Sequence, residues 1–301
     1  YLARARGVQT DAQSLVICEG FRGGQVLLAA ALAGRTDPTV AIEDPSLPGI
    51  DIPWRTAGWR VVDLPVDDDG ARVDLLTPQI DVVVLTPSHQ FPLGGALSPA
   101  RRRQLAAWAA QTGGFIVEDD YDGEFRFDRR PVPAVQRSAP TRVIYVGSVS
   151  KTLDPHLRIG WLALPRDLVA SVTDAARALS GGVPILNQLA LAELIDSGDY
   201  ERHIRRQRRE YARRREHLRE ALRDIGIDAP GISAGLHACI PVATRPDDRA
   251  DAMVAVHLLD RYVRSHPMPA ALVVGFGAPP RRSFETAIDA LIRELGPPEH
   301  V

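Results

Sequence analysis

Short apolar runs alternate with amphipathic stretches over about the first 200 residues of the chain. The runs are rich in valine and isoleucine, which is typical of a mainly parallel sheet that helices cover on both faces. The predicted strands are Ser14–Cys18, Thr39–Glu43, Arg60–Pro65, Asp81–Thr86, Phe115–Glu118, Arg142–Val146 and Ile159–Leu164. The predicted helices between them include Phe21–Ala33, Ser98–Gln111 and Asp167–Leu179. Ser98 followed by Pro99 is a strong helix start, an N-cap before proline at the first helical position.

The pattern changes after about Asp199. A long helix is predicted over Tyr200–Asp224, with nine arginines between Arg202 and Arg219. Glutamates and apolar positions interrupt these arginines, which favours a solvated or domain-bridging helix over a phosphate-binding one. The remaining predicted elements form a small α+β unit. They are a strand pair, Ser233–Pro241 and Ala271–Phe276, and two helices, around Ala250–Arg264 and at Phe284–Leu295.

Composition narrows the classes of protein to consider. Of the 301 residues, 45% are hydrophobic and 25% are charged, which are ordinary globular values. The net charge of −2 gives no basic footprint for nucleic acid. With only Cys18 and Cys239, neither a disulfide scaffold nor a four-cysteine zinc site is expected, and a reducing cytoplasm is the simplest setting. No apolar run approaches the ~18 residues that span a bilayer.

The basic residues are unusually uniform. Lysine and arginine total 36, and a single one of them, Lys151, is a lysine. An arginine stays protonated in proteins, whereas a lysine amine can lose its proton and condense with a carbonyl group. Lys151 is therefore a candidate for imine chemistry, and chance survival of one surface lysine is the alternative.

The position of Lys151 supports the chemical reading. It lies in Gly147–Thr152, directly after a predicted strand, and Arg158 opens the next strand. The acidic segment Glu118–Asp122 follows another strand end, and such ends open onto the ligand crevice of an α/β sheet. A lysine, a carboxylate and phosphate donors are what pyridoxal 5'-phosphate requires of a protein. A turn and a surface lysine remain the simpler explanation of each piece alone.

Three ordered motifs carry a family resemblance. They are Thr86-Pro-Ser-His-Gln-Phe-Pro92, Glu118-Asp-Asp-Tyr-Asp-Gly-Glu-Phe125, and Tyr145-Val-Gly-Ser-Val-Ser-Lys-Thr-Leu153 followed by Arg158-Ile-Gly-Trp-Leu162. With them, the chain resembles the aminotransferase-like domain of MocR-type regulators of the GntR superfamily, from Val16 to about Leu295. The resemblance implies an α/β, fold-type-I architecture like that of aspartate aminotransferase. A large domain with a mainly parallel seven-stranded sheet would be followed by a small α+β domain.

The resemblance also implies domain limits and partners. Residues 1–12 would be the end of a linker or helix, residues 13–198 the large domain and residues 199–301 the small domain. In the family a DNA-binding domain comes before this part, in agreement with a first helix that Gly7 ends after Arg6. A homodimer, an amine or amino-acid effector, and DNA contact only through that other domain are the implied partners. The implied location is the cytoplasm.

Residue roles follow from the same resemblance. Lys151 would form the internal aldimine with pyridoxal 5'-phosphate, Asp119 would pair with the pyridine nitrogen, and Tyr121 would bond to the ring 3-hydroxyl. The phosphate would be held by the remaining residues of the predicted site, namely Ser148, Arg158 and the backbone N–H groups of Phe21 and Arg22, with Ser150 beside Lys151.

Departures from the family pattern decide between functions. Leu47 stands where relatives carry a ring-stacking aromatic, and Val273 lies in the late strand where aminotransferases usually place an arginine for the substrate carboxylate. The sequence therefore favours an effector-sensing domain without efficient transaminase turnover. A stand-alone aminotransferase is the first alternative, and a cofactor-independent dimerisation scaffold is the second.

Overall fold

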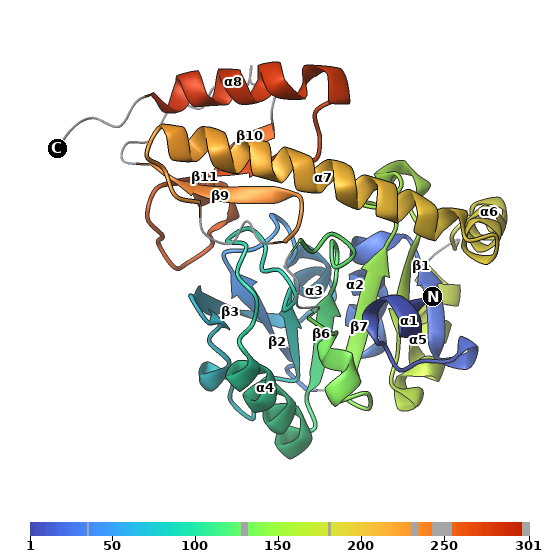
Figure 1. Ribbon diagram of the computed structural model, residues 1–301. Helices are drawn as coiled ribbons and strands as arrows, with labels where there is room; N and C mark the ends of the chain where they lie inside the picture. Colours follow the sequence, from blue (N-terminus) through green and yellow to red (C-terminus); the bar gives the residue numbers. More distant parts are fainter. Residues whose placement is uncertain (35, 128–131, 180–181, 230–233, 243–254, 297–301) are drawn as a thin grey trace.

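The computed structural model describes residues 1–34, 36–127, 132–179, 182–229, 234–242 and 255–296, in two layered parts (Figure 1). The larger part is built on an eight-stranded sheet with the order β1-β8-β7-β6-β5-β2-β3-β4. Its strands are β1 Leu15–Cys18, β2 Thr39–Asp44, β3 Arg60–Asp67, β4 Gly70–Ala71, β5 Val82–Leu85, β6 Phe115–Asp119, β7 Val143–Ser148 and β8 Gly160–Ala163.

The centre of this sheet is parallel. Strands β3, β2, β5, β6 and β7 pair in parallel, whereas β8 runs antiparallel to both of its neighbours and β4 runs antiparallel to β3. Strands β2, β5 and β6 are buried along their whole length, as expected where helices cover both faces. Their carboxyl ends therefore meet at one edge, which is where ligands bind in such sheets.

Alternate residues of each strand serve opposite faces. In β7, Ile144 and Val146 pack in the core under α2 Gly20–Ala31, α3 Ile52–Thr56 and α5 Val169–Leu179. The neighbouring Val143 packs on the opposite face, with residues of α4 Pro99–Thr112. Tyr145 lies on that face too, beside α1 Leu2–Arg6 and α6 Ile185–Asp196.

The smaller part is a three-stranded antiparallel sheet with two helices, and it lies above the carboxyl edge of the large sheet in Figure 1. Its strands are β9 His237–Pro241, β10 Ala255–Leu258 and β11 Ala271–Gly275, in the order β10-β11-β9. Helices α7 Asp199–Asp224 and α8 Phe284–Leu295 cover one face.

Helix α7 bridges the two parts. Near its start, Tyr200 and Ile204 pack with Tyr145 of the large sheet, and near its end, Leu218 and Leu222 pack with the small sheet. The domain-bridging interpretation of this arginine-rich helix is therefore confirmed. The predicted domain limit between residues 198 and 199 stays a prediction.

A second connection joins the parts at the end of β2. The carboxylate of Asp44 accepts hydrogen bonds from the backbone N–H groups of Arg264, Ser265 and His266, at 2.7, 2.9 and 2.8 Å. The Arg264 guanidinium also pairs with Asp63 at 2.6 Å. This contact fixes the small sheet against the site edge of the large one.

The predicted strands of the large sheet are confirmed, with ends that differ by two residues at most. The predicted count of seven omits β4, a two-residue strand that pairs with the end of β3. The helix predicted around Ala250–Arg264 is wrong where the structure describes it, because Ala255–Leu258 forms strand β10 and Leu259–Tyr262 a single 3-10 turn. Residues 250–254 of that predicted helix lie outside the described residues. So does Ser233, the start of the predicted strand Ser233–Pro241. No helix in the described ranges is long and apolar enough to cross a membrane.

Candidate functional site

The end of β6 gathers five acidic side chains, and most of them have protein partners. Glu118 accepts hydrogen bonds from the backbone N–H groups of Val135 and Gln136, at 2.8 and 2.9 Å. Asp120 receives a two-point ion pair from Arg6, at 2.5 and 3.0 Å, and the hydroxyl of Tyr145 at 2.7 Å. These two carboxylates fasten the strand end to neighbouring segments.

Two further acids of this segment are also occupied. Glu124 accepts the Tyr1 hydroxyl at 3.0 Å. Asp122 Oδ2 lies 2.8 Å from Nδ1 of His89. Among the described residues, Asp119 alone of the five has no hydrogen-bond donor on its carboxylate. Its side chain is thus available to a ligand.

The charge environment of Asp119 favours a cationic partner. Burial raises the pKa of this carboxyl well above its usual range, and the nearby Asp120, Asp122 and Glu43 raise it further. Lys151 acts in the opposite direction, which places its amine within electrostatic reach of Asp119. A protonated ring nitrogen would relieve the repulsion among these carboxylates.

The lysine stands on an anchored turn. Ser148 is the last residue of β7, Ser150 is half-buried and Lys151 is exposed. The next residue, Thr152, is held by the Tyr200 hydroxyl at 2.8 Å, and its carbonyl accepts a hydrogen bond from His203 Nε2 at the same distance. Helix α7 therefore fixes the base of the turn, while the lysine amine has no hydrogen-bond partner among the residues that the structure describes.

The start of α2 lies against this turn. Ser148 pairs with Gly160 across β7 and β8, and a Cβ on Gly160 would come within 2.7 Å of Gly20 Cα and 3.0 Å of the Gly147 carbonyl. The absence of a side chain at Gly160 thus lets the first residue of α2 approach the strand ends. The first N–H groups of a helix lack partners within it and attract anions.

The other predicted phosphate-binding residues border the same region. Phe21 is half-buried against the core, and Arg22 is exposed, with Nη2 3.5 Å from the Pro48 carbonyl. Arg158 is exposed and adopts the left-handed conformation, with φ 54°. The turn and the start of α2 thus offer two hydroxyls, two guanidinium groups and free backbone N–H groups.

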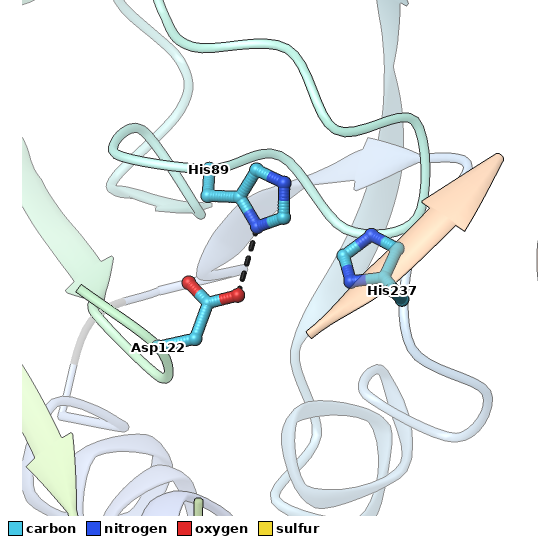
Figure 2. Close-up of side chains that lie close together, drawn as sticks. All are labelled: His89, Asp122 and His237. Carbon is cyan, nitrogen blue, oxygen red and sulfur yellow. Dashed lines mark hydrogen bonds and ion pairs between the residues drawn. The ribbon is translucent and has the colours of Figure 1, made fainter. Parts of the chain in front are cut away.

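Sequence reasoning did not identify a buried group of residues behind Tyr121. Its hydroxyl lies 2.9 Å from Nδ1 of His89, and the His89 ring is 4.7 Å from that of His237 in β9. Figure 2 shows His89 and Asp122 joined, with His237 facing them from the small sheet. The sequence gives no pairing signal for residues this far apart, although histidines in both a strand-end motif and an apolar strand were a hint.

The two departures from the family pattern are visible in space. Leu47 is 41% exposed in the connection between β2 and α3. Val273 is buried in β11 and packs with apolar neighbours that include Phe91 and Tyr262. Within the described residues, β11 brings no cationic side chain to the site.

The sheet order and the two-part arrangement are those of the fold-type-I, aspartate-aminotransferase-like class of protein. A crystal structure of an archaeal alanine:glyoxylate aminotransferase superposes on 98% of this chain and 78% of its own, with a TM-score of 0.86 and 21% identity. The model of the family "Aminotransferase class I and II" matches residues 1–267, and the chain belongs to this family.

Curated relatives refine the picture. The uncharacterized HTH-type transcriptional regulator YdeL of Bacillus subtilis is 36% identical over 80% of this chain and 53% of its own length. The probable rhizopine catabolism regulatory protein MocR of Rhizobium meliloti is 36% identical over 71% of this chain and 44% of its own. The resemblance to MocR-type regulators is thus confirmed, and the chain spans about half the length of these relatives.

The family and fold imply pyridoxal 5'-phosphate, and the residues present fit it. The only lysine lies within electrostatic reach of Asp119, a buried carboxylate that has no hydrogen-bond donor in the described part of the chain, and Gly160 leaves a cradle at the start of α2. Lys151 would hold the cofactor covalently, and Asp119 would pair with its ring nitrogen. The turn after β7 and the start of α2 would bind its phosphate. When bound, the cofactor supplies an aldehyde for amines and an electron-withdrawing ring.

Proposed function

We propose that this chain is the effector-sensing part of a MocR-type transcriptional regulator. Pyridoxal 5'-phosphate would be held as an internal aldimine on Lys151, and an amine or amino-acid effector would replace the lysine in an external aldimine. An effector that binds two arrangements of the protein with different affinity shifts the balance between them. DNA would be contacted by a further domain, as the HTH-type names of the relatives suggest.

The observation that carries this proposal is the apolar surrounding of Val273. Transamination requires the substrate held so that its Cα–H faces the lysine base, and misplacement by about 1 Å costs on the order of a hundredfold in rate. Val273 is only 4% exposed and is enclosed by β9, β10 and Phe91, so β11 offers no guanidinium for a carboxylate. An amine would thus form the covalent adduct without the pose that turnover needs.

Incubation of the holoprotein with a panel of amino acids and 2-oxoglutarate tests this proposal. The expected result is a shift of the visible absorption band without accumulation of keto acid. Sustained production of keto acid above about one turnover per second, near the low end of ordinary enzymes, would establish the alternative, a stand-alone aminotransferase.

A homodimer is part of the same proposal. The start of helix α6 exposes the apolar side chains of Ile185, Leu186 and Leu189, at 64%, 75% and 59%. Apolar groups clustered in this way mark an interaction surface, and a second copy of the chain would cover them. Light scattering should give the mass of a dimer for the chain and of a monomer for Leu186→Glu.

A further inference from the structure

The buried group behind Tyr121 has a defined arrangement of protons. His89 is 2% exposed, and its Nδ1 lies 2.8 Å from Asp122 Oδ2. A carboxylate can only accept, so His89 Nδ1 carries the proton and donates it to Asp122. His89 Nε2 is buried and has no hydrogen-bond partner within the described ranges, which fits the nitrogen that lacks a proton.

This arrangement directs the hydroxyl of Tyr121. Its oxygen lies 2.9 Å from the same Nδ1, which already carries a proton, so Tyr121 cannot donate there. Burial raises the pKa of Tyr121 well above its usual range, and the charges of Asp122, Asp119 and Glu43 raise it further. The phenol thus keeps its proton, which it can donate to the carboxylate of Asp122 or to an acceptor on the site side.

The small sheet takes part through His237. Its Nε2 donates to the Pro92 carbonyl at 3.1 Å, and its ring lies against those of His89 and Phe91, at 4.7 and 4.9 Å. Burial, His89 and Lys151 hold the pKa of His237 well below its usual range, so this ring is neutral. The main chain at Gly235 also packs so closely on His89 and Asp122 that a Cβ there would overlap both.

From these contacts we propose that His89 is a positioning residue. With Asp122, it orients the Tyr121 phenol toward the ring oxygen of the cofactor. Because His89 also contacts His237 of β9, the orientation of the phenol depends on the position of the small sheet. The inference rests on the proposed function, because it assigns a role toward the same cofactor. It makes Tyr121 the point at which movement of the small sheet reaches the cofactor ring.

The first test uses the cofactor-free chain. Long-range ¹H–¹⁵N NMR of histidine-labelled protein should show His89 as the Nδ1–H tautomer, identified by the signals lost in His89→Gln. His217→Gln is the matched control and should leave these signals unchanged. In the unaltered chain, the His217 ring contacts only Phe284 among the described aromatic rings. An Nε2–H tautomer or a doubly protonated ring at His89 would overturn the proposal, whether or not a cofactor binds.

The second test follows the visible absorption of the bound cofactor against pH. A donor to the ring oxygen draws charge from it and weakens its hold on a neighbouring imine proton. Tyr121→Phe should therefore raise the titration midpoint by about one pH unit. His89→Phe should raise it by a smaller amount, and His89→Gln, which keeps a donor for Asp122, should lie between His89→Phe and the unaltered chain.

The double variant separates positioning from independent action. If His89 acts through Tyr121, His89→Phe combined with Tyr121→Phe should titrate as Tyr121→Phe alone does. Additive shifts, or an unchanged midpoint in both folded His89 variants, would contradict the role. Failure of the unaltered chain to bind the cofactor would instead contradict the proposed function and leave the NMR result to decide on His89.

Discussion

The carboxylates at the end of β6 show how surroundings set the task of a side chain. Asp119 and Asp120 are adjacent and buried, yet Asp120 is joined to Arg6 and Tyr145 while Asp119 has no donor within the described ranges. Removing one partner of a buried, hydrogen-bonded ion pair strongly destabilises the fold. The first of these aspartates is thus suited to a ligand and the second to the fold.

Substitution of Asp119 and of Asp120 should affect different quantities, namely cofactor affinity and the stability of the fold. Asp119→Asn should weaken binding of pyridoxal 5'-phosphate about ten- to a hundredfold, because it removes a charge-assisted hydrogen bond, with little loss of stability. Asp120→Asn should lower the free energy of unfolding by about 3–5 kcal/mol, because it leaves the Arg6 charge unpaired. Absorbance titration and denaturant unfolding measure the two quantities. Equal losses of affinity in two equally stable variants would show that the wrong carboxylate was chosen.

For single residues, the sequence predicted which side chains carry the chemistry of the site better than it predicted the contacts that hold them in place. Lys151 is conspicuous because it is the only lysine, and the Asp119 assignment followed from a family motif. No local pattern shows that Asp120 meets Arg6, or that His89 meets His237, because those contacts form only when distant segments pack. The roles of the predicted site residues remain proposals.

Among the elements, α2 depends most on one small residue. Its first turn lies against Gly160, where a Cβ would be 2.7 Å from Gly20 Cα, closer than real Cβ contacts come. The backbone atoms concerned cannot rotate away. A side chain at residue 160 must therefore displace the start of the helix.

Gly160→Ala should accordingly weaken cofactor binding at least tenfold, because the N–H groups of α2 would move from the phosphate. Helix N-termini stabilise anions by up to about 2 kcal/mol in partly buried geometries, which corresponds to such a factor. Gly34→Ala, at a site with no atom within 4 Å of a Cβ, is the control. Affinity measured by absorbance titration should be unchanged in the control, and an unchanged affinity in Gly160→Ala would argue against the cradle.

Strand β10 shows why one element was predicted wrongly. A helix was predicted over this segment, but Val256 and Leu258 alternate along a strand that pairs with Val274 and Leu272 of β11. Local propensity does not reveal that an edge of β11 is available for pairing. The two-residue β4 escaped prediction because it is too short to carry a pattern, and its place depends on the hairpin with β3.

At the scale of the whole molecule, buried acids make stability depend on pH. Burial, as the largest cause, raises the pKa of Glu43, Glu118 and Glu124 to about 7 each, from 4.5. Their folded pKa exceeds the unfolded one, so their contribution to stability is complete below about pH 4.5 and is lost as pH rises toward 7. Each group accounts for at most about 3 kcal/mol.

The cofactor-free chain should therefore be less stable at pH 8 than at pH 5. Glu43→Gln should reduce this difference, and Glu193→Gln, at an exposed position of α6, should not. Denaturant unfolding at the two pH values gives the comparison. The contact at Asp44 does not obscure it, because N–H donors from Arg264, Ser265 and His266 keep the pKa of that carboxyl low despite its burial. A chain that is equally stable at both pH values would contradict the assignment of these three glutamates.

The central claim is that Lys151 holds pyridoxal 5'-phosphate covalently, and borohydride reduction followed by peptide mass mapping tests it directly. Reduction should abolish the visible band and leave the reduced cofactor on the peptide that contains Lys151. Lys151→Arg should carry no label within the site, because this variant has no lysine and only the α-amino group of the chain can react. A reducible, site-bound cofactor in Lys151→Arg, or an unlabelled Lys151 peptide in the unaltered chain, would contradict the account.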